Sequence, residues 1–212
     1  MKKETESHQE QMCKGHHGGR GASSYWMHDP DIVFGAIRLS PGETFLDMGC
    51  GPGDYAIKAA AIVGRSGRVI AVDASPGMIR NVSEKIDQEG RTNIRTMRTD
   101  ITRPLAIEDS SIDVCFLSTV LHIFQLERCG KSIFNEVRRV LRPNGRMAVI
   151  ECKKERLPFG PPFEMRLSVN EISEVATASG FIEKGYVDLG YNYIVVYRVG
   201  NENGGIRQWE TY

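Results

Sequence analysis

Three glycines on alternate positions form the most informative segment of the sequence. Gly49, Gly51 and Gly53 directly follow an apolar run at residues 44–48, and a helical pattern begins immediately after them. Glycine has no Cβ atom, so the backbone can turn sharply there and approach a ligand closely. In a parallel sheet, a loop between a strand and a helix lies at the carboxyl edge, where open α/β folds bind ligands. The segment therefore predicts a binding loop.

Two aspartates near this loop indicate what it binds. Asp47 precedes the first glycine, and Asp73 ends a second apolar run at residues 68–72, twenty residues after Gly53. A carboxylate at the second strand end can accept hydrogen bonds from both hydroxyls of a ribose. An acid ahead of the glycines is unfavourable beside a phosphate but suits an ammonium group. Both acids favour a nucleoside with an amino-acid tail and a sulfonium cation, which is S-adenosylmethionine (SAM).

A nicotinamide dinucleotide is the alternative cofactor. Its fingerprint is G-x-G-x-x-G, with the pyrophosphate at the helix N-terminus. Counting from Gly49, the third glycine of that pattern is replaced by Asp54. Because a carboxylate at the start of the helix repels a pyrophosphate, an NAD-dependent oxidoreductase is the less favoured hypothesis.

These residues belong to a longer series of motifs that resembles the class I SAM-dependent methyltransferases. The series runs from about residue 25 to residue 198, and it continues after the two acids with motifs at residues 99–101, 111–118 and 139–145. Within that class the arrangement is most similar to the small branch of type 11 and ubiquinone/menaquinone-biosynthesis methyltransferases. Members of this branch lack a large substrate domain, so the resemblance implies that loops recognise the methyl acceptor.

The resemblance assigns a role to each motif. It implies that Asp73 binds the ribose, that Met78 lies against the adenine ring and that Asp100 meets the adenine amino group. It also places Ser118, at the end of the fourth strand, beside the methionine tail and the methyl group. The cofactor-binding residues implied in this way are Asp47, Gly49, Gly51, Gly53, Asp73, Ala74, Met78, Asp100, Ile101 and Ser118. S-adenosylhomocysteine (SAH) is then the product.

A catalytic base and a lid are the remaining elements of such a site. Methyl transfer from a sulfonium has a neutral leaving group, and a base is required only if the acceptor must lose a proton. His122, which follows the fourth strand, is the first candidate base, although a histidine satisfied within a half-buried turn fits the same position. His28 is a second candidate base, and a place in an aromatic cover fits it equally well. Tyr25, Trp26 and His28 are candidates for a substrate-side lid over the cofactor.

Two further groups of side chains have alternative interpretations. Cys13, His16 and His17 could ligate a soft metal or metalloid, and Cys13 with Cys152 would then suggest a thiol-bound metalloid substrate. Arsenite methyltransferases share the resembled fold and use several cysteines, but the cysteines here do not match their pattern. The spacing of Cys13, His16 and His17 is not that of a zinc site, so a polar arm without a metal is favoured. The charged run at residues 153–156, with Arg142 and Arg146, could steer an anionic substrate or could be a solvated loop.

Alternating apolar patterns predict a Rossmann-like, doubly wound α/β fold. Its seven-stranded sheet is mostly parallel and ends in a C-terminal antiparallel hairpin. Strands are expected at residues 44–48, 68–72, 93–97, 112–117, 146–152, 181–187 and 192–198. Helices are expected at about 29–38, 55–63, 75–86, 133–141 and 170–179, with a turn at 142–145. We expect a flexible arm over residues 1–24, the methyltransferase domain over 25–199 and a tail over 200–212.

Composition limits the partners and the location of the protein. The 212 residues contain 27 Lys and Arg against 27 Asp and Glu, which does not favour a surface that wraps nucleic acid. No run approaches the roughly 20 apolar residues of a membrane span, and the first residues lack the apolar stretch of a signal peptide. A cytoplasmic location is therefore expected. The sequence predicts no particular oligomeric state.

The leading hypothesis is a SAM-dependent methyltransferase that acts on a small-molecule acceptor of unknown identity. A SAM-binding sensor or assembly protein without catalysis is an alternative of a different class. It stays open because no residue identifies itself as a base from the sequence and there is no room for a large substrate domain.

Overall fold

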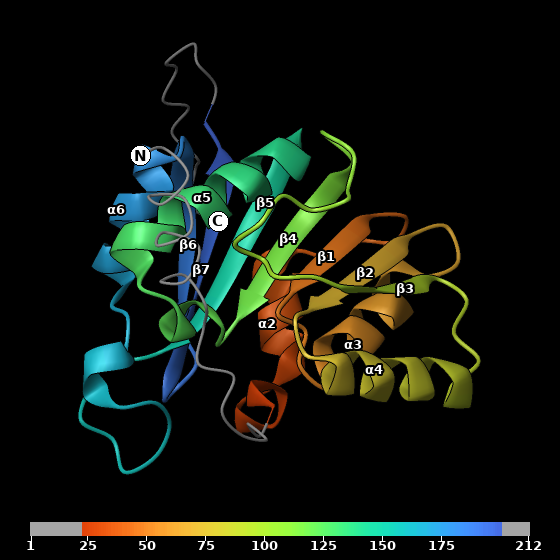
Figure 1. The fold of residues 1–212 in the computed structure, drawn as a ribbon, viewed down its shortest axis with the longest axis horizontal. Helices are drawn as coiled ribbons and strands as arrows, with labels where there is room; N and C mark the ends of the chain where they lie inside the picture. The colour runs from red at the N-terminus through yellow and green to blue at the C-terminus, as the bar shows by residue number, and fades with distance from the viewer. Residues whose placement is uncertain (1–22, 201–212) are drawn as a thin grey trace, which may run out of the picture.

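A mixed sheet of seven strands forms the centre of the structure, a computed structural model that describes residues 23–200 (Figure 1). The order of the strands across the sheet is β3-β2-β1-β4-β5-β7-β6. They are β1 Thr44–Met48, β2 Arg68–Asp73, β3 Ile94–Arg98, β4 Ile112–Ser118, β5 Leu141–Cys152, β6 Phe181–Asp188 and β7 Asn192–Val199.

The pairing of these strands confirms the predicted fold class. β1 pairs in parallel with β2 and β4, and the pairs β2–β3 and β4–β5 are parallel as well. The C-terminal hairpin inserts β7 antiparallel between β5 and β6, with a register shift in β6 between Glu183 and Gly185. The sheet is therefore Rossmann-like, doubly wound and mostly parallel, and the carboxyl ends of β1 to β5 share one edge.

Helices cover both faces of the sheet (Figure 1). The helices are η1 Ser24–Met27, α2 Pro30–Ile37, α3 Asp54–Val63, α4 Pro76–Gln88, η2 Leu121–Ile123, α5 Leu126–Val140, η3 Phe163–Met165 and α6 Val169–Ala178. One buried cluster joins α2, α3 and α4 to side chains such as Phe45 and Phe116, and the other joins α5 and α6 to Leu46 and Leu117. Because adjacent strand residues point to opposite faces, β1 and β4 contribute to both clusters.

The starts of the helices follow local capping chemistry. The Asp29 carboxylate caps α2, which has Pro30 in its first turn. The Ser75 hydroxyl caps α4 in the same way, and a reciprocal capping box between Ser168 and Glu171 starts α6. Such side chains satisfy N–H groups that have no partner within the helix. The predicted starts of α2 and α4 are confirmed.

Residues 142–145, expected to form a turn, lie within β5 instead. Strand β5 begins at Leu141, but its pairing with β4 jumps from Ile112↔Leu141 to Val114↔Arg146. The intervening residues have no partner on β4, so they bulge away from an otherwise continuous strand. The Pro-Asn-Gly sequence, which is typical of a turn, therefore forms a bulge within β5.

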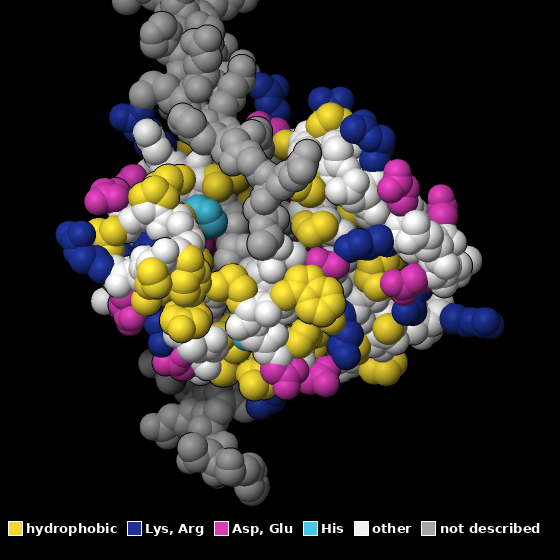
Figure 2. All heavy atoms as spheres, turned by 90° about the horizontal axis from the view of Figure 1, so that it is seen from below, with side chains coloured by type: hydrophobic (Ala, Val, Ile, Leu, Met, Phe, Trp, Pro, Cys, Tyr) yellow, Lys and Arg dark blue, Asp and Glu magenta, His cyan; other side chains and the backbone are white. Residues whose placement is uncertain are grey.

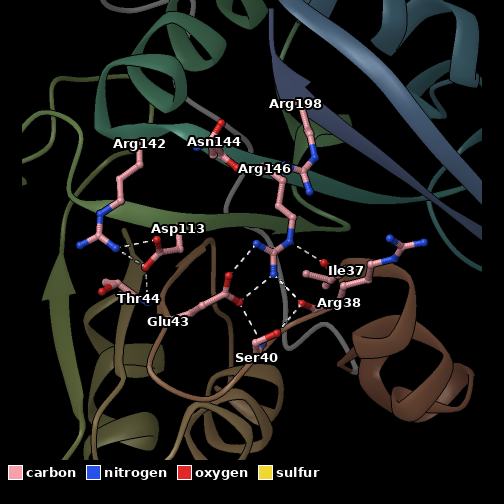
Figure 3. A network of polar contacts seen from close by, with 10 residues as sticks. All are labelled: Ile37, Arg38, Ser40, Glu43, Thr44, Asp113, Arg142, Asn144, Arg146 and Arg198. Carbon is pink, nitrogen blue, oxygen red and sulfur yellow. Dashed lines mark hydrogen bonds and ion pairs between the residues drawn. The ribbon is translucent and has the colours of Figure 1, made fainter. Parts of the chain in front are cut away.

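Arg146 ties three elements together at the amino edge of the sheet (Figure 3). It is 7% exposed, and its guanidinium donates to the carbonyl oxygens of Ile37 and Arg38 at the end of α2. Its two terminal nitrogens also bind both carboxylate oxygens of Glu43 at 2.8 and 2.7 Å. A bidentate, largely buried pair of this kind fixes geometry strongly.

We expect Arg146→Ala to lower the free energy of unfolding by about 2–3 kcal/mol, because it leaves the half-buried Glu43 carboxylate and two carbonyls without their partner. Urea denaturation measures this difference. Arg198→Ala is the matched control, since the exposed Arg198 makes one hydrogen bond, to the Asn144 carbonyl at 3.2 Å. Equal losses for the two variants would contradict the role given to Arg146.

The predicted N-terminal arm and C-terminal tail lie mostly outside the described residues. Of the predicted arm at residues 1–24 and the predicted tail at 200–212, the structure describes 23, 24 and 200. Ser24 is buried and begins η1, so the described fold starts before residue 25. No helix within residues 23–200 combines the length and the apolar character needed to cross a membrane.

Candidate functional site

The glycine loop follows β1 at the carboxyl edge of the sheet, and its three glycines have different reasons to be glycine. All three adopt positive φ, at 80°, 51° and 82° for Gly49, Gly51 and Gly53. A Cβ on Gly49 would lie 2.5 Å from Val120, and one on Gly53 would lie 2.6 Å from Val82. A Cβ on Gly51 would meet no atom within 4 Å. Packing thus requires two of the glycines, and only Gly51 leaves the backbone open to a ligand.

Asp73 connects this loop to the end of β2. Its Oδ2 atom accepts a hydrogen bond from the Gly51 N–H at 3.0 Å, and Oδ1 accepts one from the Ser75 N–H at 2.8 Å. A carboxylate has about four acceptor positions, so two stay available for ribose hydroxyls. The geometry therefore suits the predicted ribose contact and gives Asp73 a second task, which is to hold the loop.

Asp47 is a buried carboxyl group with an unsatisfied oxygen. It is 2% exposed, and its Oδ2 atom has no hydrogen-bond partner. Burial, together with the negative charges of Asp73 and Asp54, raises the pKa of Asp47 to about 8. A ligand that brings an ammonium group to this oxygen would satisfy it, because the opposite charge favours the ionised form. The residues present therefore fit SAM, whose amino-acid tail carries such a group.

The residues predicted to hold the adenine lie next to Asp73. β2 and β3 are adjacent and parallel, so Asp73 and Asp100 reach the same edge. Asp100 Oδ1 accepts hydrogen bonds from the N–H and the hydroxyl of Thr102 at 2.9 and 2.8 Å. Ile101 is buried, whereas Ala74 and Met78 are half-buried at the start of α4. The predicted cofactor residues that follow β1, β2 and β3 therefore lie at the same edge of the sheet.

The predicted lid packs on a tyrosine beside β4. The hydroxyls of Ser118 and Ser24 lie 2.8 Å apart, and both residues are buried. Tyr25 makes an edge contact with Tyr55 at a centroid distance of 5.1 Å, and His28 Nε2 lies 2.5 Å from the Tyr55 hydroxyl. Burial lowers the pKa of His28, so it favours the neutral imidazole.

Trp26 differs from its two neighbours in the predicted lid, because it is 77% exposed. It contacts the edge of the Tyr25 ring at a centroid distance of 5.0 Å. Seen from below, this side of the molecule carries many hydrophobic side chains at its surface, with a histidine among them (Figure 2). The lid role of all three residues stays a prediction.

His122 lies in η2, directly beyond β4, and has a buried partner. Its Nδ1 atom is 2.8 Å from Glu151 Oε2, and the two side chains are 13% and 1% exposed. Sequence analysis missed Glu151. An acid in the second-last position of the apolar run 146–152 was the available signal, since a charge there requires a partner.

The segment after β5 is organised by another buried side chain that sequence analysis did not select. Arg166 is 3% exposed and donates to the carbonyl oxygens of Pro161 and Lys153 at 2.9 and 3.2 Å. Phe159, on the same segment, meets Tyr191 edge-to-face at 4.7 Å between ring centroids. Arg166 thereby holds this segment beside the end of β5.

The hypothesis of one basic cluster that steers an anion is wrong. Arg142 and Arg146 belong to the first half of β5 and are paired at the amino edge, Arg142 with Asp113 at 2.6 Å. Lys153 and Lys154 follow the other end of that strand, where they pair with Asp188 and Glu171. The length of the strand separates the two groups, so they cannot act on one substrate.

The described residues contribute little to a metal or metalloid site. Cys13, His16 and His17 lie outside the described part of the chain. Within residues 23–200, no three His, Cys, Asp or Glu side chains gather as a metal site would require. Cys152 is a free, buried thiol, and burial raises its pKa, which makes the thiolate scarce at neutral pH.

The fold and this site define a Rossmann-like class I SAM-dependent methyltransferase domain. The Methyltransferase domain family matches residues 39–189, and the chain belongs to that family. A SAM-dependent methyltransferase from Aquifex aeolicus is similar in structure, with a TM-score of 0.77, 25% identity and coverage of 91% of this chain and 97% of that one.

Two curated relatives are similar over part of their length. An arsenite methyltransferase of Halobacterium salinarum is 34% identical over 60% of this chain and 31% of its own length. A demethylmenaquinone methyltransferase of Lactococcus lactis is 32% identical over 56% of this chain and 45% of its own length. The chain spans less than half the length of these relatives. The second match agrees with the resemblance to the ubiquinone/menaquinone branch.

Proposed function

We propose that this protein transfers a methyl group from SAM to a small-molecule acceptor. One observation carries the proposal: the buried Asp47 oxygen without a partner lies at the foot of a glycine loop whose open position, Gly51, is held by Asp73. The loop and the two acids match a ligand with a ribose and a cationic amino-acid tail. Membership in the methyltransferase family supports this reading of the site.

The roles of the residues follow from their positions. Asp73 accepts the ribose hydroxyls, Asp47 binds the ammonium group, and Gly51 allows the tail to pass close to the backbone. Met78 and Ile101 flank the adenine, whose amino group Asp100 binds. When bound, SAM supplies a methyl carbon that is activated by its sulfonium. The protein aligns the acceptor with that carbon and excludes water, and Tyr25, Trp26 and His28 form the cover.

Calorimetry with SAH tests the cofactor. We expect SAH to bind below ~100 μM, because this site offers several charge-assisted contacts, and NADH not to bind, because Asp54 repels its pyrophosphate. Binding of NADH without binding of SAH would overturn the proposal in favour of an oxidoreductase.

A turnover assay separates the enzyme from a SAM-binding sensor or assembly protein. Formation of SAH from SAM is measured with a panel of thiols, phenols, quinols and amines. We expect at least one acceptor class to accelerate the formation of SAH. A sensor would bind SAH, but no acceptor would accelerate SAH formation. The cytoplasmic location and the absence of a nucleic-acid partner stay predictions.

A further inference from the structure

Both carboxylate oxygens of Glu151 bind the segment that carries His122. Its Oε1 atom accepts hydrogen bonds from the backbone N–H groups of Leu121 at 2.8 Å and of His122 at 3.3 Å. Its Oε2 atom lies 2.8 Å from His122 Nδ1. Glu151 itself has 0% of its surface exposed, so this segment rather than water stabilises its charge. The arrangement fixes both the position and the orientation of the imidazole.

This arrangement also selects one tautomer of His122. A carboxylate can only accept, so the proton of the neutral imidazole lies on Nδ1 and the lone pair lies on Nε2. Within the described residues, Nε2 has no hydrogen-bond partner. A histidine held in this way by a buried acid keeps its basic nitrogen available to accept a proton.

The charges around His122 make it a stronger base. Burial alone would lower the pKa of His122, but the hydrogen bond and the negative charge of Glu151 outweigh burial, and the pKa lies above its ordinary value. Arg166 is the other charge that acts on the ring, and it works in the opposite direction. The raised pKa makes the neutral imidazole a stronger proton acceptor.

The pair is close to the glycine loop. Val120, two residues before His122, packs on Gly49, where a Cβ would lie 2.5 Å from its side chain. Ser118 ends β4 on the same edge, and β4 pairs with β5, which carries Glu151. The base and the loop therefore face the same end of the sheet.

We propose that His122 is the general base of methyl transfer and that Glu151 is its positioning residue. The acceptor is then a small molecule whose attacking atom carries a weakly acidic proton. This inference rests on the proposed function, and it narrows the acceptor class. In the step, His122 Nε2 takes the proton, and the electron pair released on the attacking atom forms the bond to the methyl carbon. The electron pair of the broken carbon–sulfur bond stays on sulfur.

Two-dimensional NMR of ¹⁵N-histidine-labelled protein tests the positioning role without any acceptor. In the wild type, we expect neutral His122 to carry its proton on Nδ1 and to titrate above pH 6.5. In Glu151→Gln, the side-chain amide can donate to Nδ1, so the proton moves to Nε2 and the pKa falls. His28 is the internal control, because its signals should not change.

Several outcomes overturn the inference. It fails if wild-type His122 carries its proton on Nε2, or if E151Q leaves the tautomer and the titration unchanged. The wild-type spectrum decides the first point even if E151Q does not fold, and Glu151→Asp, which keeps a carboxylate, should restore the Nδ1 tautomer.

Kinetics on the panel test the catalytic role. For an acceptor that the wild type methylates, we expect His122→Asn and E151Q to lower kcat by roughly 100-fold or more, with affinity for SAH retained. Unchanged kcat in both variants overturns the role of the base. Absence of SAH binding to the wild type would instead end the proposed function, while the tautomer result would still stand.

Discussion

Asp73→Ala should weaken SAH binding by several hundred-fold or more, the largest loss expected for any single side chain in the cofactor site. The substitution leaves two ribose hydroxyls without a charged acceptor, at about 1.5–3 kcal/mol for each hydrogen bond. It also releases the Gly51 N–H, whose bond to Asp73 holds the open position of the loop. Isothermal titration calorimetry measures the change.

The control for this prediction is Asp87→Ala, which removes an exposed carboxylate from α4 without touching the loop. It should bind SAH as the wild type does. An Asp73→Ala protein that stays folded and keeps wild-type affinity would contradict the ribose contact. Asp73→Asn removes the charge and keeps one acceptor oxygen, so it can accept from the Gly51 N–H or from the Ser75 N–H but not from both.

Asp47→Asn should stabilise the free protein at alkaline pH and weaken SAH binding at the same time. The carboxyl titrates near 3.8 when unfolded and at about 8 when folded. Between these values the folded state holds one proton more than the unfolded state, so the stability of the wild type falls as pH rises through that range. At pH 9 the loss is on the order of 5 kcal/mol, and the neutral amide avoids it.

Urea denaturation from pH 5 to pH 9 measures the difference between the two proteins. This titration should already favour D47N by about 1.6 kcal/mol at pH 5, and the curves should diverge further toward pH 9. Asp31→Asn is the control, because its exposed carboxylate pairs with Lys58 on the surface and should leave the pH dependence unchanged. Parallel curves for wild type and D47N would show that Asp47 is ionised at neutral pH in the free protein.

The same carboxyl should couple SAH binding to proton release. Near pH 7 the free protein holds a protonated Asp47, and an ammonium group bound to it favours the ionised form. Binding then releases up to about one proton, which appears as a dependence of the calorimetric enthalpy on the buffer. D47N should bind with no such dependence.

Much of the candidate cofactor site could be predicted from the sequence, because several of its residues follow strands that local patterns indicate. The glycines follow one apolar run and Asp73 ends the next, and parallel strands bring their ends to one edge. Asp100 was instead implied by the resemblance to the methyltransferases. The same reasoning predicted the antiparallel hairpin from two β runs separated by a short turn. These inferences require only local periodicity and the rules for joining parallel strands.

The residues missed by sequence reasoning depend on contacts between distant segments. Glu151 acquires its role only because β5 lies beside β4, which places it under η2, thirty residues away in sequence. Arg146 and Lys153 are only seven residues apart in sequence. Because a strand rises about 3.3 Å per residue, that separation corresponds to about 23 Å. The turn expected at residues 142–145 became a bulge because pairing with β4 resumes at Arg146.

The strand order also determines how the sheet ends. Within residues 23–200, β3 and β6 are the outermost strands, and an exposed edge invites pairing with another chain. β3 carries exposed arginines, Arg95 and Arg98, along its short length. β6 carries the exposed Glu183 and Lys184 at its register shift. Like charges on β3 and an irregular backbone on β6 disfavour the addition of a further strand at these edges.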